Sequence, residues 1–398
     1  MSAVPVVSGV LLGSADAAKP LLVLGPSLGT SATALWSRAA ETLTNNFHVV
    51  AWDLPGHGTS PPATESFTVA ELARGVLALV DDVLAERGEP GASFAYAGDS
   101  VGGAVGIQLL LDHPGRIESA TLLCTGARIG TPEGWMERAD LVRSSGTPLM
   151  VDRSAARWFG PGFIERNPEV TTGLLHSLQD ADRFSYAWTC EALASFDVRA
   201  RLSEITVPVL AVAGTFDEPT PVESVRQIAD DVTNGRLVVL NVAHLAPAER
   251  PTDVARLISA HSAVPRTIDD LREAGMAVRR AVLGDSHVDG ATADITDFTR
   301  DFQDLITQYA WGSIWSRPGL DRRSRSIITL TALVARGHHE ELAMHVRAAR
   351  TNGLTNDEIK ELLLQTAIYC GVPDANIAFR IAQGVLAKLD SDGPETQP

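Results

Sequence analysis

A short turn flanked by glycines, Gly98-Asp99-Ser100-Val101-Gly102-Gly103, restricts the fold of this chain more than any other stretch. It follows an apolar run at 94–97 and precedes an apolar, helix-favouring segment at 104–111. A serine held between a strand and a helix needs a strained backbone, so the positions two residues before and after it must be nearly free of side chain. The pattern predicts a nucleophilic serine at the end of a strand. A simple Gly/Ser loop is the alternative, and the partners expected for Ser100 elsewhere in the chain argue against it.

Apolar runs alternate with helical patterns on both sides of this turn. Continuous apolar runs are typical of parallel strands buried on both faces, and the alternation with helices indicates an α/β domain over residues 1–262. The strands are expected at 21–24, 47–52, 94–97, 120–124, 209–213 and 237–240, after an N-terminal hairpin at 6–12. The long interval between Cys124 and Val209 shows no clear strand. Four or five helices there, at about 128–200, are expected to form a lid, and extra core helices are the alternative.

Two further side chains follow the last two expected strands. Serine is a weak nucleophile at neutral pH and needs a base, which in turn needs an orienting acid. In a strand–turn–helix setting of this kind the order along the chain is serine, acid, histidine. Asp217 comes directly after the strand at 209–213, and His244 directly after the next one. We therefore expect Ser100, Asp217 and His244 to form a catalytic triad, and we interpret His57 as a turn residue.

An oxyanion hole would complete this site with two backbone N–H groups. One is expected from Val101, directly after the nucleophile, and the other from the loop after the strand at 21–24, at Leu28. Only the backbone of Leu28 matters for this role, so its side chain neither supports nor opposes the assignment.

Residues 1 to about 262 resemble the 3-oxoadipate enol-lactonases of the α/β-hydrolase family. The resemblance rests on Ser27-Leu28-Gly29-Thr30, on the turn at 98–103, on residues 127–131 followed by Trp135, and on shorter pieces at 157–159, 190–192 and 243–245. It implies hydrolysis of an enol-lactone, with Trp135 among the residues that bind the substrate. Non-haem haloperoxidases and carboxylesterases share much of the pattern and are the alternative.

The net charge and the cysteine content indicate which binding partners and which cell compartment suit this chain. Lys and Arg total 33 against 49 Asp and Glu, a formal net charge of −16, which argues against a nucleic-acid partner. No apolar run approaches the roughly 18 residues of a membrane span, and the N-terminus lacks the pattern of a signal peptide. Three widely spaced cysteines make a disulfide framework improbable. We expect a cytoplasmic protein that acts on small molecules.

The alternation of expected strands and helices ends after residue 262. Segment 263–270, which contains Pro265, is expected to link two domains. Beyond it we find no strand, and the sequence predicts an all-α domain over 271–390 with a polar tail at 391–398. Its helices are expected at 271–283, 296–306, 322–335, 340–350, 357–369 and 375–389. Thr355-x-x-Glu358 spells a capping box before the fifth of these helices.

Three titratable side chains align near the start of the helix expected at 340–350. At about 100° per residue, His338, Glu341 and His345 fall within about 60° of one another on a helix. We interpret them as a catalytic cluster that uses no metal. A solvated helix face and a metal site are the alternatives, because His and Glu one helical turn apart can chelate an ion.

The stretch from about 274 to 386 resembles the 4-carboxymuconolactone decarboxylases. The matching runs are 309–323, 341–349, 352–355 and 369–373. The wider superfamily includes alkyl hydroperoxidase D, with a C-x-x-C motif and a histidine four residues later. Here those positions carry His338, Glu341 and His345, so dithiol peroxidase chemistry is excluded. The resemblance implies loss of CO₂ from 4-carboxymuconolactone and a homo-oligomer formed through this domain.

This decarboxylation needs no cofactor. The departing carboxylate sits on a carbon conjugated through a double bond to the lactone carbonyl, so the electrons left behind delocalise onto that oxygen. The protein has to stabilise the oxyanion and deliver a proton to carbon. His345 is our first choice for the general acid, assisted by His338 and Glu341. Guanidinium groups expected to hold the substrate's carboxylates are Arg322, Arg323 and Arg325, with a solvent-facing helix turn as the alternative.

The two resemblances predict a bifunctional enzyme of protocatechuate breakdown, the β-ketoadipate pathway. The C-terminal domain would produce 3-oxoadipate enol-lactone, and the N-terminal domain would hydrolyse it to 3-oxoadipate. The alternative is an esterase or haloperoxidase-like enzyme attached to a helical oligomerisation module without catalytic activity.

Overall fold

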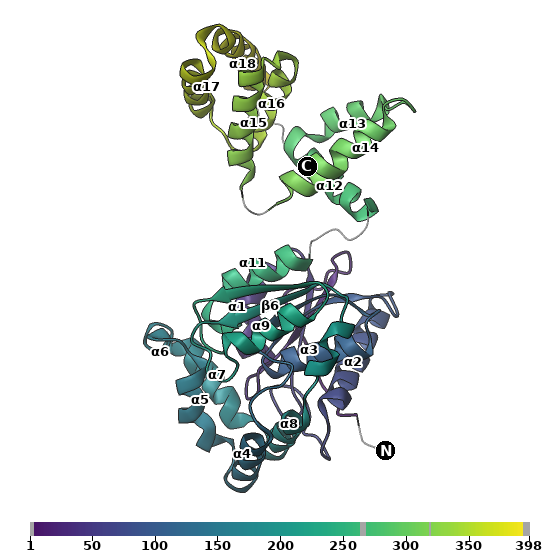
Figure 1. Ribbon diagram of the computed structural model, residues 1–398, viewed down its shortest axis with the longest axis vertical. Coiled ribbons are helices and arrows are strands. Elements are labelled where there is room, and N and C mark those ends of the chain that lie inside the picture. Colours follow the sequence, from purple (N-terminus) through teal and green to yellow (C-terminus); the bar gives the residue numbers. More distant parts are fainter. Residues whose placement is uncertain (1–3, 263–267, 318–319, 393–398) are drawn as a thin grey trace. The chain divides into compact units, whose positions relative to one another are not determined.

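The computed structural model describes residues 4–262, 268–317 and 320–392 (Figure 1). The chain divides into two compact units, Met1–Ala263 and Val264–Pro398. Residues 263–267 of the segment expected as a linker, and 393–398 of the expected tail, lie outside the described residues. The first helix of the second unit begins at Ile268 and the last ends at Asp392. Residues 268–270 and 391–392 are therefore helical and not part of a linker or tail.

The first unit contains a seven-stranded sheet of order β1-β3-β2-β4-β5-β6-β7. The strands are β1 Gly9–Leu12, β2 Leu21–Gly25, β3 His48–Trp52, β4 Phe94–Asp99, β5 Ile117–Leu123, β6 Val209–Gly214 and β7 Gly235–Leu240. All neighbours are parallel except β1, which is antiparallel to β3. Every residue of β2, β3, β4 and β6 is buried, which explains their continuous apolar runs. The predicted α/β architecture with a mostly parallel sheet is confirmed.

The expected N-terminal hairpin is wrong. Residues 9–12 form β1, but they pair with β3, Gly9 opposite Trp52, instead of with residues 6–7. The backbone of Ser8 is engaged elsewhere, because its N–H donates to the Ser60 hydroxyl at 2.7 Å and its carbonyl accepts from the Asp53 N–H at 3.0 Å. A long-range partner strand, and not the local turn, decides the pairing of β1.

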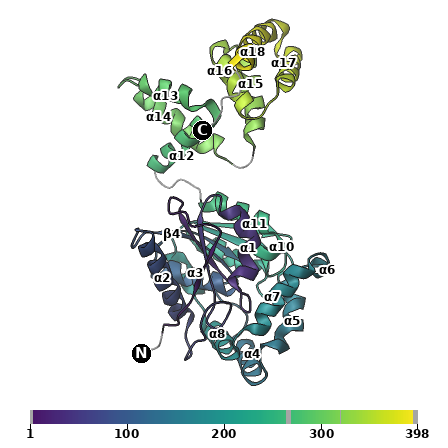
Figure 2. The ribbon, with the colours of Figure 1, turned by 180° about the vertical axis from the view of Figure 1, so that it is seen from behind.

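Helices surround this sheet. The pair α1 (Ala32–Leu43) and α11 (Pro251–Ser262) packs together, as does the pair α2 (Val69–Glu86) and α3 (Val101–Asp112). Helix α9 (Val222–Asp231) packs on β6 and β7. Between β5 and β6 the chain forms α4 Pro132–Ser145, α5 Val151–Trp158, α6 Phe163–Arg166, α7 Pro168–Asp180 and α8 Arg183–Ser195. Figure 2 shows these five helices gathered beside the sheet. We refer to α4–α8 as the lid.

The second unit has no strand among its described residues. Its helices are α12 Ile268–Leu283, α13 Asp285–Ala293, α14 Arg300–Ile306, α15 Arg322–Arg336, α16 His339–Thr351, α17 Asn356–Cys370 and α18 Val372–Asp392, and η3 (Thr307–Trp315) is a π-helix. The six expected helices are present, whereas α13 and η3 were not expected. One apolar core lies among α15–α18, and a second joins α12, α13 and η3 to α16.

None of the described helices is long and apolar enough to cross a membrane.

Candidate active sites

The backbone at Ser100 turns sharply between β4 and α3. Its φ of 53° and ψ of −114° lie in a region that residues with a side chain rarely adopt. A Cβ on Gly98 would lie 2.3 Å from the Gly102 carbonyl oxygen, and one on Gly102 would lie 2.5 Å from the Gly25 carbonyl carbon. The two glycines of the sequence pattern are therefore required by close backbone contacts. The Thr125 hydroxyl holds the turn by donating to the Ser100 carbonyl at 2.7 Å.

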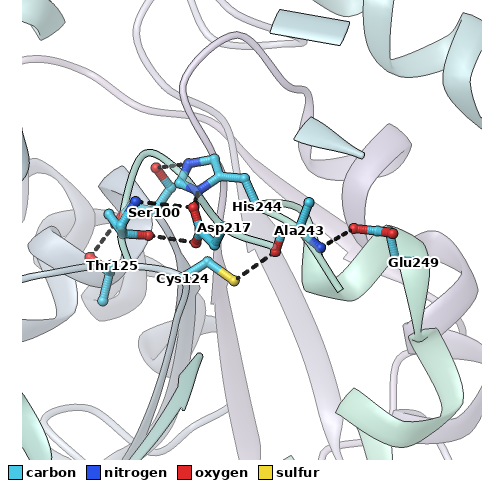
Figure 3. A network of polar contacts seen from close by, with 8 residues as sticks. Ser100, Cys124, Thr125, Asp217, Ala243, His244 and Glu249 are labelled. Carbon is cyan, nitrogen blue, oxygen red and sulfur yellow. Dashed lines mark hydrogen bonds and ion pairs between the residues drawn. The ribbon is translucent and has the colours of Figure 1, made fainter. Parts of the chain in front are cut away.

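Ser100, His244 and Asp217 are brought together at the carboxyl ends of β4, β7 and β6 (Figure 3). The Ser100 Oγ lies 2.8 Å from the His244 Nε2. The His244 Nδ1 lies 2.9 Å from Oδ1 and 3.1 Å from Oδ2 of Asp217. All three side chains are buried. The geometry is that of a nucleophile bonded to a base that is oriented by an acid.

Asp217 is held as a carboxylate. Burial opposes its ionisation, but the His244 imidazole and the hydrogen bonds of Thr220 outweigh this effect and lower the pKa of Asp217 below its ordinary value. Thr220 donates its N–H at 3.0 Å and its hydroxyl at 2.6 Å. A carboxylate only accepts hydrogen bonds, so the Nδ1 of His244 carries the proton. The Nε2 is then free to accept the proton of Ser100.

The two loops expected to form the oxyanion hole lie side by side. The Gly102 N–H donates to the Pro26 carbonyl at 2.8 Å, which fixes the loop after β2 against the turn at Ser100. Among the described residues, neither the Leu28 N–H nor the Val101 N–H has a hydrogen-bond acceptor. Leu28 also lines the cavity that reaches Ser100. Both N–H groups are therefore available to an anionic oxygen.

The cavity at Ser100 is basic. It is bounded by Ser100 and His244 on the sheet side and by lid residues that include Trp135, Arg138, Arg153 and Arg157. The Arg138 guanidinium lies over the Trp135 ring, 5.4 Å from its centroid. Three guanidinium groups beside a buried nucleophile suit a substrate that carries a carboxylate.

Sequence reasoning found Trp135 but missed the three arginines. A signal was present, because Arg138 follows Trp135 by three residues, and Arg153 and Arg157 are four apart. Residues with these spacings share one helix face. The competing His57 lies apart from the triad, where its Nδ1 is 2.9 Å from the Pro55 carbonyl oxygen and its ring stacks on Tyr186.

Glu249, at the end of α10 (Ala246–Glu249), ties the histidine loop to the lid. Its carboxylate accepts the Ala243 N–H at 2.7 Å (Figure 3). It also accepts the Gly160 N–H at 3.0 Å. Burial raises the pKa of Glu249 in spite of these hydrogen bonds. Ala243 immediately precedes His244, so this carboxylate acts on the position of the base. The role of Glu249 was not predicted from the sequence, although this residue follows His244 by only five positions.

The second candidate site lies at the start of α16. The helix begins at His339, and His338 precedes it with a φ of −81° and a ψ of 69°. The predicted helical spacing therefore holds for Glu341 and His345, one turn apart, but not for His338. His338 and Glu341 are exposed, whereas His345 is half-buried.

His345 is electrostatically coupled to two neighbours. Burial lowers its pKa below the ordinary value of 6.5, the charge of Glu341 acts in the opposite direction, and His287 adds to the lowering. His287 comes from α13, a helix that the sequence analysis did not find. Within the described parts of the chain, no group of three His, Cys, Asp or Glu side chains is arranged to hold a metal ion.

The three arginines expected to bind carboxylates begin α15. Arg323 forms an ion pair with Glu358. Arg325 donates to the carbonyl oxygens of Leu320 at 3.1 Å and of Arg317 at 2.9 Å, and Arg322 is exposed. Two of the three guanidinium groups therefore already have protein partners.

Family comparisons match both units. Residues 16–244 fit the model described as serine aminopeptidase, S33, and residues 300–384 fit that of the carboxymuconolactone decarboxylase family.

Individual relatives give more specific similarities than these family models. The first unit is 35% identical over 239 residues to 3-oxoadipate enol-lactonase 2 of Acinetobacter baylyi, covering 60% of this chain and 86% of the relative. The second is 46% identical over 115 residues to 4-carboxymuconolactone decarboxylase of the same organism, covering 29% and 86%. The crystal structure of the enol-lactonase from Burkholderia xenovorans LB400 superposes with a TM-score of 0.59 at 30% identity, over 64% of this chain and 95% of that one.

We predict that Glu249→Gln weakens catalysis by His244 but does not abolish it. An amide can accept one of the two backbone N–H groups, but its NH₂ cannot accept the other, so a charge-assisted bond is lost. We expect kcat for hydrolysis of a chromogenic acetate ester to fall by about 10-fold, with KM nearly unchanged.

The control is Glu165→Gln, which changes an exposed lid carboxylate and should leave both constants as they are. An unchanged kcat in a folded Glu249→Gln protein would show that the carboxylate does not position His244.

Proposed function

Because the chain joins a member of the 3-oxoadipate enol-lactonase family of α/β-hydrolases to a member of the carboxymuconolactone decarboxylase family, we propose that it converts 4-carboxymuconolactone to 3-oxoadipate in two steps. The C-terminal unit removes CO₂ to give 3-oxoadipate enol-lactone, and the N-terminal unit hydrolyses that lactone. The proposal rests on the presence of both units in one chain, since the product of one reaction is the substrate of the other.

In the proposed hydrolysis the Ser100 Oγ attacks the lactone carbonyl while the His244 Nε2 takes its proton. Asp217 stabilises the imidazolium that forms, and the N–H groups of Leu28 and Val101 receive the negative charge on the carbonyl oxygen. The ring C–O bond then breaks, His244 protonates the leaving enol oxygen, and the enol tautomerises to a ketone. A water molecule deprotonated by His244 attacks the acyl-serine, which releases 3-oxoadipate and restores Ser100.

The basic cavity supports this substrate. The enol-lactone carries one carboxylate arm in addition to the reacting ester. Arg138, Arg153 and Arg157 line the cavity at Ser100, and a planar guanidinium matches carboxylate geometry. Trp135, held by its indole N–H at 2.6 Å from the Ile129 carbonyl, forms a flat wall on which the lactone ring can pack.

In the proposed decarboxylation the C–C bond to the departing carboxylate breaks and CO₂ leaves. The electron pair moves through the double bond onto the lactone carbonyl oxygen, and a proton then adds to carbon. His345 is the proposed proton donor, with His338 and Glu341 assisting. The substrate carboxylates would be held by Arg322, Arg323 or Arg325, and the scheme uses no metal and no cofactor. Glu341 supports the role of His345, because its charge favours the protonated imidazole.

We also propose a cytoplasmic homo-oligomer assembled through the C-terminal unit. Large apolar side chains are exposed there, among them Phe298 (95%), Tyr369 (79%) and Ile368 (78%). Ile368 and Tyr369 are neighbours at the end of α17, and exposed apolar side chains of this kind favour association with another copy. The cytoplasmic location follows from the cysteine pattern and stays a prediction.

The second candidate function is an esterase or haloperoxidase-like hydrolase whose C-terminal helices serve only in assembly. The same exposed apolar surface favours it. In the first proposed function His345 donates a proton during decarboxylation, whereas in the second it has no catalytic role.

We predict distinct products for two variants supplied with 4-carboxymuconolactone. Ser100→Ala should release CO₂ at the wild-type rate and accumulate enol-lactone, because only the nucleophile of the second step is missing. His345→Ala should lower the rate of CO₂ release by at least about 100-fold, the usual scale of general acid catalysis.

Gas analysis and chromatography of the lactone and of 3-oxoadipate measure these outcomes. Normal CO₂ release by His345→Ala would favour the assembly-only alternative, and loss of CO₂ release in folded Ser100→Ala would contradict the division of labour.

We predict that CO₂ release increases toward acid pH. The pKa of His345 is lowered by burial below 6.5, so at neutral pH the imidazole is mainly neutral, and the protonated donor forms only as the pH falls. The rate from rapid-quench measurements on Ser100→Ala should rise with a midpoint below 6.5. A rate that is flat or falls from pH 8 to pH 6 would exclude His345 as the proton donor.

We predict that charge on the exposed apolar surface disrupts assembly. The double variant Ile368→Glu/Tyr369→Glu should have a smaller mass by light scattering than the wild type, because burial of two carboxylates in an interface is costly. The matched control is Leu149→Glu, which alters an exposed lid residue and should leave the mass unchanged. A monomeric wild type would contradict the assembly.

A further inference from the structure

Arg279, on α12, is a buried cation without an acidic partner. Its side chain is 6% exposed. One guanidinium nitrogen, Nη1, donates to the Gln303 Oε1 at 3.2 Å and the Thr307 Oγ1 at 3.4 Å. The Nε is buried and has no hydrogen-bond partner. Among the described residues, no carboxylate forms an ion pair with Arg279, and burial lowers the pKa of its guanidinium.

Neighbouring arginines show how unusual this is. Arg272, on the same helix, pairs with Asp304 at 3.1 Å. Arg280 pairs with Asp285 at 2.9 Å and Asp289 at 2.6 Å. Acidic side chains are thus present in this unit, but the two oxygens that accept hydrogen bonds from Arg279 are neutral. A buried, unpaired charge destabilises a fold, and an anion bound from outside the chain would reduce that cost.

Arg279 lies on a helix that packs against the helix of the proposed decarboxylation site. Thr307 is the first residue of η3, a π-helix, and π-helical turns occur frequently at functional sites. A Cβ on Gly275 would lie 2.1 Å from the Thr307 carbonyl oxygen, so α12 and η3 approach closely here. Helix α12 also packs against α16, which carries His345, and both contribute to one apolar core with α13 and η3.

We propose that Arg279 binds a substrate carboxylate in the C-terminal unit, through its unpartnered Nε–H and the adjacent guanidinium edge. This inference rests on the proposed function and names a residue outside the three arginines of α15. The bound carboxylate is the one that the substrate retains. A cation on the departing carboxylate would stabilise the ground state more than the transition state, in which that negative charge moves into the ring.

Three variants test this role. Arg279→Met keeps the volume and removes the charge, Arg279→Lys keeps the charge and loses the planar guanidinium, and Arg280→Met is the matched control on the same helix. Arg279→Met should raise KM for CO₂ release at least 10-fold with a melting temperature equal to or above that of the wild type. Arg279→Lys should recover part of the KM, and Arg280→Met should leave KM unchanged.

A binding measurement that does not depend on activity accompanies the kinetics. Titration calorimetry with succinate as the probe should find one site fewer per chain in Arg279→Met than in the wild type. An unchanged KM and an unchanged number of sites, with a lower melting temperature, would show that Arg279 is structural. If the wild type releases no CO₂, the proposed decarboxylation fails, and the succinate titration still decides whether Arg279 binds carboxylates.

Discussion

The strained backbone at Ser100 is the constraint on which the first site depends. A turn with φ of 53° is stable only where neighbouring groups hold it. Here the Gly102 N–H binds the Pro26 carbonyl, and Thr125 binds the Ser100 carbonyl. The same contacts bring the loop of Leu28 beside the nucleophile. Strain, oxyanion donors and the hydrogen bond to His244 therefore arise from one local packing arrangement.

The two units differ in the partners of their buried titratable side chains. In the first site, the buried carboxylate of Asp217 has partners in His244 and Thr220. In the second unit, His345 is half-buried beside another histidine, and Arg279 is buried beside neutral oxygens. The triad is thus complete within its unit, whereas the proposed role of Arg279 requires an anion from the ligand.

The strands and the triad could be predicted because their signals are local. Continuous apolar runs mark the parallel strands, and Asp217 and His244 directly follow two of them. The pairing of β1 and the bond between Glu249 and Gly160 depend on contacts distant in sequence, which periodicity does not encode. The arginines of the lid have helical spacings, but the cavity that they line exists only in the folded unit. The π-helix η3 does not follow the 3.6-residue period, and α13 is short, with a glycine at 290. Missing α13 also concealed His287.

We propose that one chain catalyses both reactions in series. Carbon-13 NMR of 4-carboxymuconolactone, labelled at the departing carboxylate and at the lactone carbonyl, follows both in a single sample of the wild-type chain. We expect labelled CO₂ and labelled 3-oxoadipate in equal amounts, with the enol-lactone appearing first and then declining. Labelled CO₂ with enol-lactone that disappears no faster than in buffer, or an unchanged starting lactone, would contradict it.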